Sequence, residues 1–254
     1  MTRLRGAHAL VTGGGTGIGA ATARALAAEG ARLTLVGRRR APLEALAAEL
    51  PDAVAAPVDV TDPDSVAAAL AVGRAAHGPV SILVNNAGAA ESGAFGRMDL
   101  DAWRRAMAVN LDALFVVTQA ALADLKAAEH GRVVTVASTA GLKGYAYTAA
   151  YVAAKHGAVG FTRALAAEFA RTGLTVNAVC PGFTETEIVE RSVETITARS
   201  GRSADEARAE LARFNPQGRL VRPQEVADAV VWLCLPGSAS VTGQSVVVAG
   251  GEVT

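Results

Sequence analysis

Three residues between positions 138 and 155 could together transfer a proton. Tyr151 and Lys155 lie four positions apart in Ala-rich sequence, and a helix there would place the phenol and the amine on one face. Ser138 directly follows the apolar run 133–137, which has the composition of a strand. If the end of that strand meets the helix, hydroxyl, phenol and amine come together. The spacing therefore predicts a proton-transfer site.

The elements that would position these residues follow a repeating pattern. Short apolar, β-branched runs alternate with Ala-, Leu-, Glu- and Arg-rich segments of helical period, which is typical of βαβ units around a parallel sheet. Strands are predicted at residues 7–12, 32–37, 53–57, 82–85, 132–138, 175–179 and 245–248. Helices are predicted at residues 17–29, 42–50, 64–77, 100–129, 149–171 and 223–235. This pattern predicts an α/β fold: a doubly wound, seven-stranded parallel sheet with helices on both faces, in a single domain spanning residues 1–254.

Residues 183–220 interrupt this alternation. The interval is rich in Glu, Arg, Ser and Thr, has weak helical stretches such as 204–213, and shows no strand pattern. It follows the sixth predicted strand at its carboxyl end, where open α/β sheets bind ligands. Because so long a connection inside a compact domain is usually functional, we expect a substrate lid; a decorative insertion is the alternative.

The composition limits the possible partners. The 24 basic and 24 acidic residues cancel, and no Lys/Arg stripe is interleaved with aromatic residues, which argues against nucleic acid. The N-terminal residues run straight into a strand and no apolar run approaches the length of a bilayer span, so we expect no membrane segment and a cytoplasmic protein. Cys180 and Cys234 are interpreted as buried free thiols. The four histidines lack the grouping of metal ligands, so no metal is predicted.

A glycine-rich loop, residues 12–19, separates the first predicted strand from the first helix. Glycines let the backbone turn tightly and approach a pyrophosphate, whose charge then lies against the amides and the positive end of the helix dipole. The spacing T-G-x-x-x-G-x-G differs from the common three-glycine dinucleotide fingerprint, but the strand–loop–helix context is the same. The residues predicted to bind the cofactor here are Gly13, Gly15, Thr16, Gly17, Ile18 and Gly19.

The end of the second predicted strand bears on the choice of cofactor. NAD-specific folds usually place an acidic residue here for the ribose diol, whereas this chain has Arg38 and Arg39. Guanidinium groups bind phosphate as rigid forks, so these arginines favour NADP(H) over NAD(H), which stays the alternative. Asp59 and Val60 follow the third strand, where the carboxylate could meet the amino group of an adenine.

Taken together, these motifs resemble the short-chain dehydrogenase/reductase family over nearly the whole chain. The family's glycine-rich loop corresponds to residues 12–19, and its N-N-A-G segment corresponds to residues 85–88. Its helical asparagine corresponds to Asn110, and its catalytic serine, tyrosine and lysine correspond to Ser138, Tyr151 and Lys155. Its P-G-x-x-x-T segment corresponds to residues 181–186, and its last strand and border correspond to 241–245 and 250–251. The resemblance implies a Rossmann-like fold. It also adds to the cofactor site Asn86, Ala87, Gly88, Tyr151, Lys155, Pro181, Gly182, Thr184 and Thr186. Thr184 stands where the family more often has an aliphatic residue, and the loop lacks a basic residue that some NADP-dependent members carry before the second glycine.

A ketone reduction needs a hydride for the carbon and a proton for the oxygen. A phenol with a pKa of about 10 is a poor acid–base catalyst at neutral pH, but a cation one helical turn away favours the phenolate. We therefore expect Lys155 to lower the pKa of Tyr151, and Ser138 to hold the substrate oxygen. The resemblance implies that Lys155 also binds the nicotinamide ribose and that Asn110 positions a water that returns the proton.

The substrate is the least determined property. Segments 154–157 and 170–183 look most similar to ketoreductases that act on 3-oxoacyl thioesters, including those of aromatic polyketide synthesis. Arginines of the expected lid could meet the phosphates of coenzyme A or of a carrier-protein arm; they are Arg191, Arg199, Arg202, Arg208 and Arg213. Residues 139–148 should form the opposite wall of the substrate pocket.

Two other functions stay open. The first is an NAD-dependent alcohol, hydroxyacyl-CoA or sugar dehydrogenase that runs oxidatively. The second is a sensor that binds NADP without turnover, although Asn110, Ser138, Tyr151 and Lys155 are all present. Family members usually assemble as tetramers through the helices around Asn110 and Tyr151, so a homotetramer, or a dimer, is expected. Small residues that would permit close helix approach are Ala113, Ala153, Gly157 and Gly160, although they could instead face the sheet.

Overall fold

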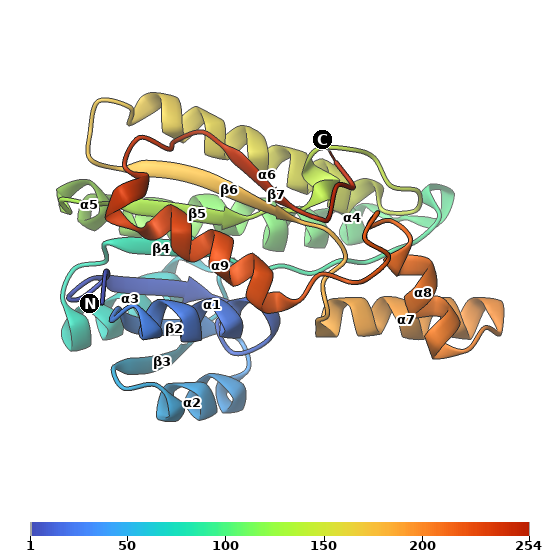
Figure 1. The fold of residues 1–254 in the computed structure, drawn as a ribbon, viewed down its shortest axis with the longest axis horizontal. Coiled ribbons are helices and arrows are strands. Elements are labelled where there is room, and N and C mark those ends of the chain that lie inside the picture. Colours follow the sequence, from blue (N-terminus) through green and yellow to red (C-terminus); the bar gives the residue numbers. More distant parts are fainter. Residues whose placement is uncertain (1, 254) are drawn as a thin grey trace.

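A seven-stranded parallel sheet forms the centre of the molecule (Figure 1). The computed structural model describes residues 2–253, and within this range the side chain of Arg199 lies outside what it describes. The strand order is β3-β2-β1-β4-β5-β6-β7, and every neighbouring pair is parallel. The strands are β1 (His8–Thr12), β2 (Arg32–Gly37), β3 (Ala53–Pro57), β4 (Ile82–Asn85), β5 (Arg132–Val136), β6 (Thr175–Pro181) and β7 (Ser245–Val248). The predicted sheet is confirmed.

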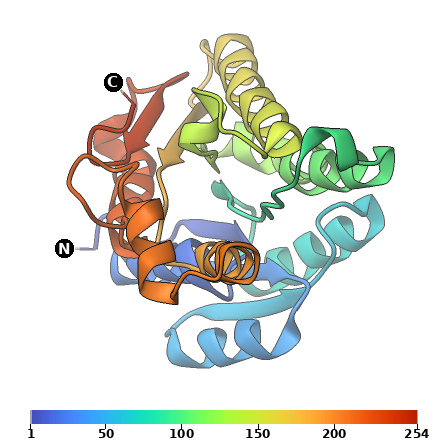
Figure 2. The ribbon, with the colours of Figure 1, turned by 90° about the vertical axis from the view of Figure 1, so that its right-hand side faces the viewer.

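Helices cover both faces of this sheet because its strands are apolar on both sides. Every position of β1, β5 and β6 is buried, as expected for strands between two helical layers. The helices α1, α2 and α9 pack on one face, and α3, α5 and α6 pack on the other (Figures 1 and 2). The helices are α1 (Gly17–Ala28), α2 (Arg40–Glu49), α3 (Pro63–His77), α4 (Leu100–Met107), α5 (Ala113–Ala127), α6 (Ala149–Glu168), α7 (Glu187–Ser200), α8 (Ala204–Ala212) and α9 (Pro223–Cys234).

The strand order defines where a ligand is expected. The chain moves outward from β1 to β3 on one side and from β4 to β7 on the other, so the winding reverses between β1 and β4. Open α/β sheets bind ligands at the carboxyl ends of the strands beside such a reversal. Figure 2 views the molecule from this end, with α7 in front of the sheet. The residues that follow β1, β4, β5 and β6 therefore surround one place.

The predicted helix 100–129 forms as one helical segment, Leu100–Ala127, but it is not α-helical throughout. A π-helical turn, Ala108–Asp112, separates α4 from α5. Asn110 lies in this turn, and its side-chain Nδ2 donates to the carbonyl oxygens of Ala89 (2.8 Å) and Ala106 (3.0 Å). Because the side chain bonds to a loop far away in the sequence, local helical period could not predict the interruption. Such turns occur frequently at functional sites.

The helical segment Leu100–Ala127 is also long and apolar enough, by length and composition, to cross a membrane. The sequence interpretation that no apolar run approaches that length was wrong in this respect. The segment owes its composition to its place in the fold, because Val117, Ala121 and Leu125 are buried in the core between α5 and the sheet. A helix that packs on a sheet can therefore be as long and as apolar as a helix that spans a membrane.

Residues 183–220 fold as two helices that project beyond the carboxyl ends of the strands (Figures 1 and 2). The stretch 204–213 was expected to be weakly helical, and it forms α8, where Ser203 and Glu206 complete a capping box. Helix α7 was not predicted. Its Val189 and Val193 pack on Ala207 and Leu211 of α8 in a separate apolar cluster. A parallel bridge between Thr184 and Val221 closes the base of the segment.

Candidate active site

The structure brings Ser138, Tyr151 and Lys155 together at the carboxyl end of β5. Strand β5 ends at Val136, two residues earlier than predicted, and the turn that follows begins at Ser138. Tyr151 lies in the first turn of α6, and the Lys155 Nζ is 5.7 Å from the centre of its ring. The Lys155 Nζ donates to the carbonyl oxygen of Val136 at 2.9 Å, so strand and helix are joined beside the phenol.

Burial sets the protonation of this group. Burial raises the pKa of Tyr151, and the Ser138 hydroxyl beside the phenol acts in the opposite direction. Burial also lowers the pKa of Lys155 to about 8. The expected lowering of the Tyr151 pKa is therefore wrong for this structure, because burial penalises the phenolate by more than the groups beside it favour it. Tyr151 is held as a neutral phenol, the form that can donate a proton.

Asn110 connects the catalytic candidates to the loop after β4. Its side chain is fully buried, and its Oδ1 accepts from the backbone amide of Ala89 at 3.2 Å. A Cβ atom on Gly88 would lie 2.9 Å from this oxygen and 3.7 Å from the Lys155 Nζ. The polar atoms of Asn110 are thus bonded to Ala89 and Ala106, and they hold the 88–89 backbone beside Lys155.

The glycine-rich loop forms a cradle at the N-terminus of α1. Gly13 and Gly17 have φ angles of 62° and 52°, which favour glycine. A Cβ atom on Gly19 would lie 2.2 Å from the carbonyl oxygen of Gly13, so only glycine fits there. The Thr12 Oγ1 accepts from the backbone amides of Asn86 and Ala87 at 2.8 and 2.9 Å. The loop thus lies against the 86–88 segment, as a loop for the pyrophosphate of a dinucleotide requires.

Other predicted cofactor residues complete this cradle. A Cβ atom on Gly15 would lie 3.2 Å from the backbone of Pro42 and Leu43, at the start of α2. Ile18 packs against the core beneath α1. A Cβ atom on Gly17 would lie 3.2 Å from the Cγ2 of Thr186. The loop after β6 therefore meets the loop after β1, although the two are far apart in the sequence.

The segment after β6 is held by short-range hydrogen bonds. Pro181 ends β6, and the Thr184 Oγ1 donates to the carbonyl oxygen of Gly182 at 3.0 Å. The Thr186 Oγ1 donates to the carbonyl oxygen of Thr184 at 3.2 Å. Thr184, unusual at this position, is buried, and its hydroxyl is satisfied within the turn.

Arg39 lies across the cofactor cradle. Its Nη2 donates to the Thr16 Oγ1 at 3.2 Å and to the two carboxylate oxygens of Glu187 at 3.0 and 2.8 Å. Thr16 precedes α1, whereas Glu187 is the first residue of α7. The guanidinium is thus bonded to a carboxylate at the place where the sequence predicts a 2′-phosphate.

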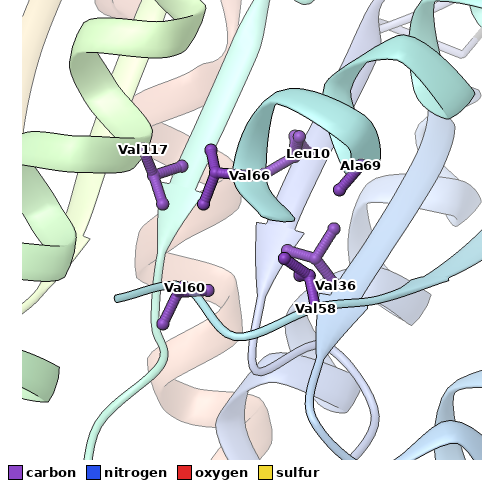
Figure 3. Close-up of a pocket in the computed structure, with 7 residues that line it drawn as sticks. All are labelled: Leu10, Val36, Val58, Val60, Val66, Ala69 and Val117. Carbon is purple, nitrogen blue, oxygen red and sulfur yellow. The ribbon is translucent and has the colours of Figure 1, made fainter. Parts of the chain in front are cut away.

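Asp59 and Val60 lie at the edge of the site. The Asp59 carboxylate accepts from the amide and the hydroxyl of Thr61, and these bonds lower its pKa, with a smaller contribution from the charge of Arg38. The Val60 side chain is buried and lines an apolar cavity of about 10 Å³ (Figure 3). The other residues around this cavity are Leu10, Val36, Val58, Val66, Ala69 and Val117. Val60 can therefore meet a cofactor only through its backbone.

The sequence reading missed one polar group beside the site. Glu252 follows the last strand, yet its side chain is only 1 % exposed, and its Oε1 accepts from Tyr145 and lies 3.1 Å from the Lys143 Nζ. Its position after Gly250 and Gly251 gave no sign of burial, because a lone Glu near the end of the described chain is ordinarily solvated. Tyr145 belongs to residues 139–148, which the sequence predicts as a wall of the substrate pocket.

Two of the arginines expected on the lid are engaged in ion pairs within the segment. Arg202 pairs with Glu210, and Arg208 pairs with Glu190 at 2.5 Å and with Asp205 at 3.7 Å. Arg199 belongs to the same prediction, but its side chain lies outside the described part of the chain. The cationic face expected for the segment is thus partly neutralised.

The fold and the arrangement of these residues define a class of protein. The family model described as short chain dehydrogenase matches residues 7–197, and the chain belongs to this family. It is therefore an oxidoreductase that interconverts alcohol and keto groups.

Individual members resemble this chain along its whole length. The protein named "Granaticin polyketide synthase putative ketoacyl reductase 1" of Streptomyces violaceoruber is 41 % identical, over 96 % of this chain and 92 % of the relative. The 3-oxoacyl-acyl-carrier-protein reductase FabG of Escherichia coli is 36 % identical, over 97 % of both chains. A crystal structure of an actinorhodin polyketide ketoreductase variant with NADPH matches with a TM-score of 0.93 and 39 % identity, over 97 % of both chains. The resemblance inferred from the motifs is confirmed.

Proposed function

We propose that this protein reduces a ketone to a secondary alcohol with NADPH, and that its substrate is a 3-oxoacyl thioester or a related polyketide. The observation that carries the proposal is the meeting of Ser138, Tyr151 and Lys155 near a glycine loop that packs too closely on its neighbours for a side chain at Gly13 or Gly19. The similarity to two ketoacyl reductases and to an NADPH-bound ketoreductase supports the direction and the substrate class.

Each residue has a role that follows from its surroundings. The cofactor, when bound, supplies the hydride. Tyr151 donates the proton to the carbonyl oxygen, since burial keeps its phenol neutral. The Ser138 hydroxyl holds the same oxygen and stabilises its developing charge. Lys155 returns a proton toward Tyr151, and Asn110 positions the 88–89 backbone beside the amine.

Residues 183–220 are proposed as the substrate lid of a single domain. They begin at the turn after β6, and α7 is tied to the cofactor cradle through Glu187 and Arg39. Residues 139–148 form the opposite wall of the pocket in this proposal. Arg191 and Arg213 stay candidates for contacts with the phosphates of a coenzyme A or carrier-protein arm, whereas Arg202 and Arg208 would first have to leave their ion pairs.

The substrate class is tested by a panel of ketones. Acetoacetyl-CoA, ethyl acetoacetate and cyclohexanone are compared at equal enzyme concentration, with the loss of reduced nicotinamide absorbance as the signal. We expect acetoacetyl-CoA to have the highest kcat/KM. A cyclic ketone that is reduced equally well would remove the thioester part of the proposal. Oxidation of the matching alcohols with NAD, if faster than any reduction, would favour the oxidative dehydrogenase, and the absence of turnover with all of them would favour the sensor.

The choice of cofactor is tested at Arg39. Replacing Arg39 by leucine removes a guanidinium that can bind the 2′-phosphate, so the Kd for NADPH should rise about tenfold or more and the Kd for NADH should hardly change. Glu187→Gln should lower the Kd for NADPH several-fold, because Glu187 competes for the same guanidinium. Binding is followed by the fluorescence of the reduced cofactor.

Glu190→Gln is the matched control for this experiment. Glu190 also lies in the first turn of α7 and pairs with an arginine, Arg208, away from the cradle. Its replacement should leave both dissociation constants unchanged. Equal effects of Arg39→Leu on NADPH and NADH would show that Arg39 does not read the 2′-phosphate.

We further propose a cytoplasmic homotetramer or dimer. Gly160 on α6 has open space around its Cα, and Phe115 on α5 is 52 % exposed, so both could meet another copy. Ala113 is buried, and a Cβ on Gly157 would touch Leu111 of the same chain, so these two small residues serve packing within the chain. Sizing chromatography decides between the assemblies.

A further inference from the structure

Residues from the 139–148 wall and from the turn after β6 meet at the carboxylate of Glu252. The Tyr145 hydroxyl donates to its Oε1, and the Lys143 Nζ lies 3.1 Å from the same oxygen. A Cβ atom on Gly182 would lie 2.8 Å from its Oε2, so glycine at the start of residues 183–220 makes room for the carboxylate. A Cβ atom on Gly250 would lie 1.9 Å from the Oδ1 of Asn215, near the other end of that segment. Glu252 thus lies where the lid, the 139–148 wall and the chain after β7 meet.

Tyr145, which bonds to this carboxylate, belongs to a cluster of three aromatic rings. The ring centres of Tyr145, Phe183 and Phe214 lie 5.1 to 6.0 Å from one another, and the Lys143 Nζ is 5.0 Å from the centre of the Tyr145 ring. Phe183 and Phe214 stand near the two ends of the lid, so Tyr145 is packed against both. The position of its ring is therefore set by packing, and the direction of its hydroxyl is set by hydrogen bonds.

The hydroxyl of Tyr145 has both of its ordinary hydrogen bonds occupied. It gives its single proton to Glu252, and it accepts from the Thr139 Oγ1, 2.6 Å away. Thr139 directly follows Ser138, so the Tyr145 hydroxyl is bonded to the residue next to the one proposed to hold the substrate oxygen. Burial and the bond to Glu252 both raise the pKa of Tyr145. Tyr145 is therefore a second phenol close to the reacting group. Its one proton is already used in the hydrogen bond to Glu252.

One carboxylate oxygen of Glu252 takes no part in this hydrogen-bond network. Its Oε2 is buried and accepts no hydrogen bond from the residues that the structure describes. A buried carboxylate oxygen without a hydrogen bond costs free energy. The packing around Glu252 and the two contacts of its Oε1 must therefore hold the side chain in this position. A residue whose only task was to anchor the chain would gain more from a neutral side chain beside this aromatic cluster.

We propose that Glu252 is a positioning residue of the substrate pocket, which holds the Tyr145 hydroxyl away from the substrate so that Tyr151 is the only phenol that donates to the carbonyl oxygen. This inference rests on the proposed ketone reduction. Two phenols that both donated to the carbonyl would hold it in two orientations, and each orientation would present a different face to the hydride. Glu252 thereby selects one enantiomer of the alcohol.

The test measures the enantiomer ratio of the product. Acetoacetyl-CoA and ethyl acetoacetate are prochiral, and their alcohols are separated by chiral chromatography. The unmodified protein should give mainly one enantiomer. Glu252→Leu frees the Tyr145 proton, and the ratio should fall about five- to tenfold, the effect of one misplaced neutral hydrogen bond. The double variant Glu252→Leu/Tyr145→Phe should restore the original ratio, because no second donor is left.

Two further variants keep the proposal open to refutation if Glu252→Leu does not fold. Tyr145→Phe alone should leave the ratio unchanged, since its hydroxyl is bonded to Glu252 and not to the substrate; a changed ratio would overturn the proposal. Glu252→Gln keeps an acceptor for Tyr145 and should have a smaller effect than Glu252→Leu. Glu129→Leu is the control, because the Glu129 side chain is 90 % exposed, in the turn between α5 and β5.

The outcomes also separate this inference from the proposed function. If the unmodified protein reduces neither probe nor any ketone of the panel, the proposed function fails. If it reduces them and the folded Glu252→Leu variant keeps the original ratio, the role of Glu252 fails alone. A ratio that falls in Glu252→Leu and does not recover in the double variant would show that Glu252 acts through the shape of the lid and not through Tyr145.

Discussion

Tyr151→Phe is expected to lower kcat about 10³-fold while leaving the Kd for NADPH within about twofold of its original value. The change removes one oxygen, and with it the phenol proton that lies beside Ser138 and is proposed to move to the carbonyl oxygen. General acid catalysis by a positioned group contributes about 10² to 10⁴ in rate. Because the ring stays and Lys155 keeps its bond to Val136, the fold and the cofactor cradle should be preserved.

The measurement is single-turnover reduction of acetoacetyl-CoA, followed by the absorbance of the reduced nicotinamide. Tyr147→Phe is the control for the loss of a phenol hydroxyl. Tyr147 belongs to the proposed 139–148 wall, so its replacement can change KM, but its side chain is 67 % exposed and no proton transfer is assigned to it. Its kcat should be unchanged. A Tyr151→Phe variant with the full rate on every good substrate would rule out the proposed mechanism.

Lys155→Met is expected to stabilise the cofactor-free protein and to abolish its activity. The buried amine has a pKa of about 8 against an ordinary value of 10.5. At about 1.4 kcal/mol per pH unit, keeping it charged at pH 7 costs roughly 3 kcal/mol. Losing the bond to Val136 offsets about 1 kcal/mol, so the free energy of unfolding should rise by about 2 kcal/mol.

The pH dependence gives this prediction its sign. The folded-state pKa of Lys155 is below the unfolded value, so its cost is complete below pH 8 and disappears as the pH rises toward 10.5. The stability advantage of Lys155→Met should therefore be largest at pH 7 and absent near pH 10.5, as measured by thermal unfolding without cofactor. Lys126→Met, on the exposed face of α5, should show no such trend. An advantage independent of pH would mean that the amine is not desolvated.

The sequence predicted those features that depend on local pattern. The seven strands follow from their apolar, β-branched runs, and the meeting of Ser138 with Tyr151 follows from a strand end next to a helix. Helix α7 also has a local pattern in the sequence, because Val189, Val193 and Ile196 have helical spacing. This pattern is weak because it lies within a run rich in Glu, Arg and Thr.

Other features depend on contacts between distant residues. The π-helical turn at Asn110 is accompanied by bonds to Ala89, 21 positions earlier, and nothing local marks it. The direction in which the Tyr151 pKa shifts depends on how much protein surrounds the phenol. The sequence spacing shows only that a lysine is near. The burial of Glu252 likewise depends on Gly182 and Tyr145, which come from other loops.

The parallel order of the strands has a consequence for how the protein can be assayed. The candidate site takes residues from the loop after β1, the segment after β4, the end of β5, the turn after β6 and the chain after β7. Strand β7 is the edge strand beside β6, so the chain that follows it reaches the site from the edge of the sheet. A chain that had folded only as far as β4 would hold a nucleotide loop without a reaction centre. Because the proposed cofactor contacts include Lys155 after β5 and Thr186 after β6, both cofactor binding and turnover report on parts of the fold beyond β4.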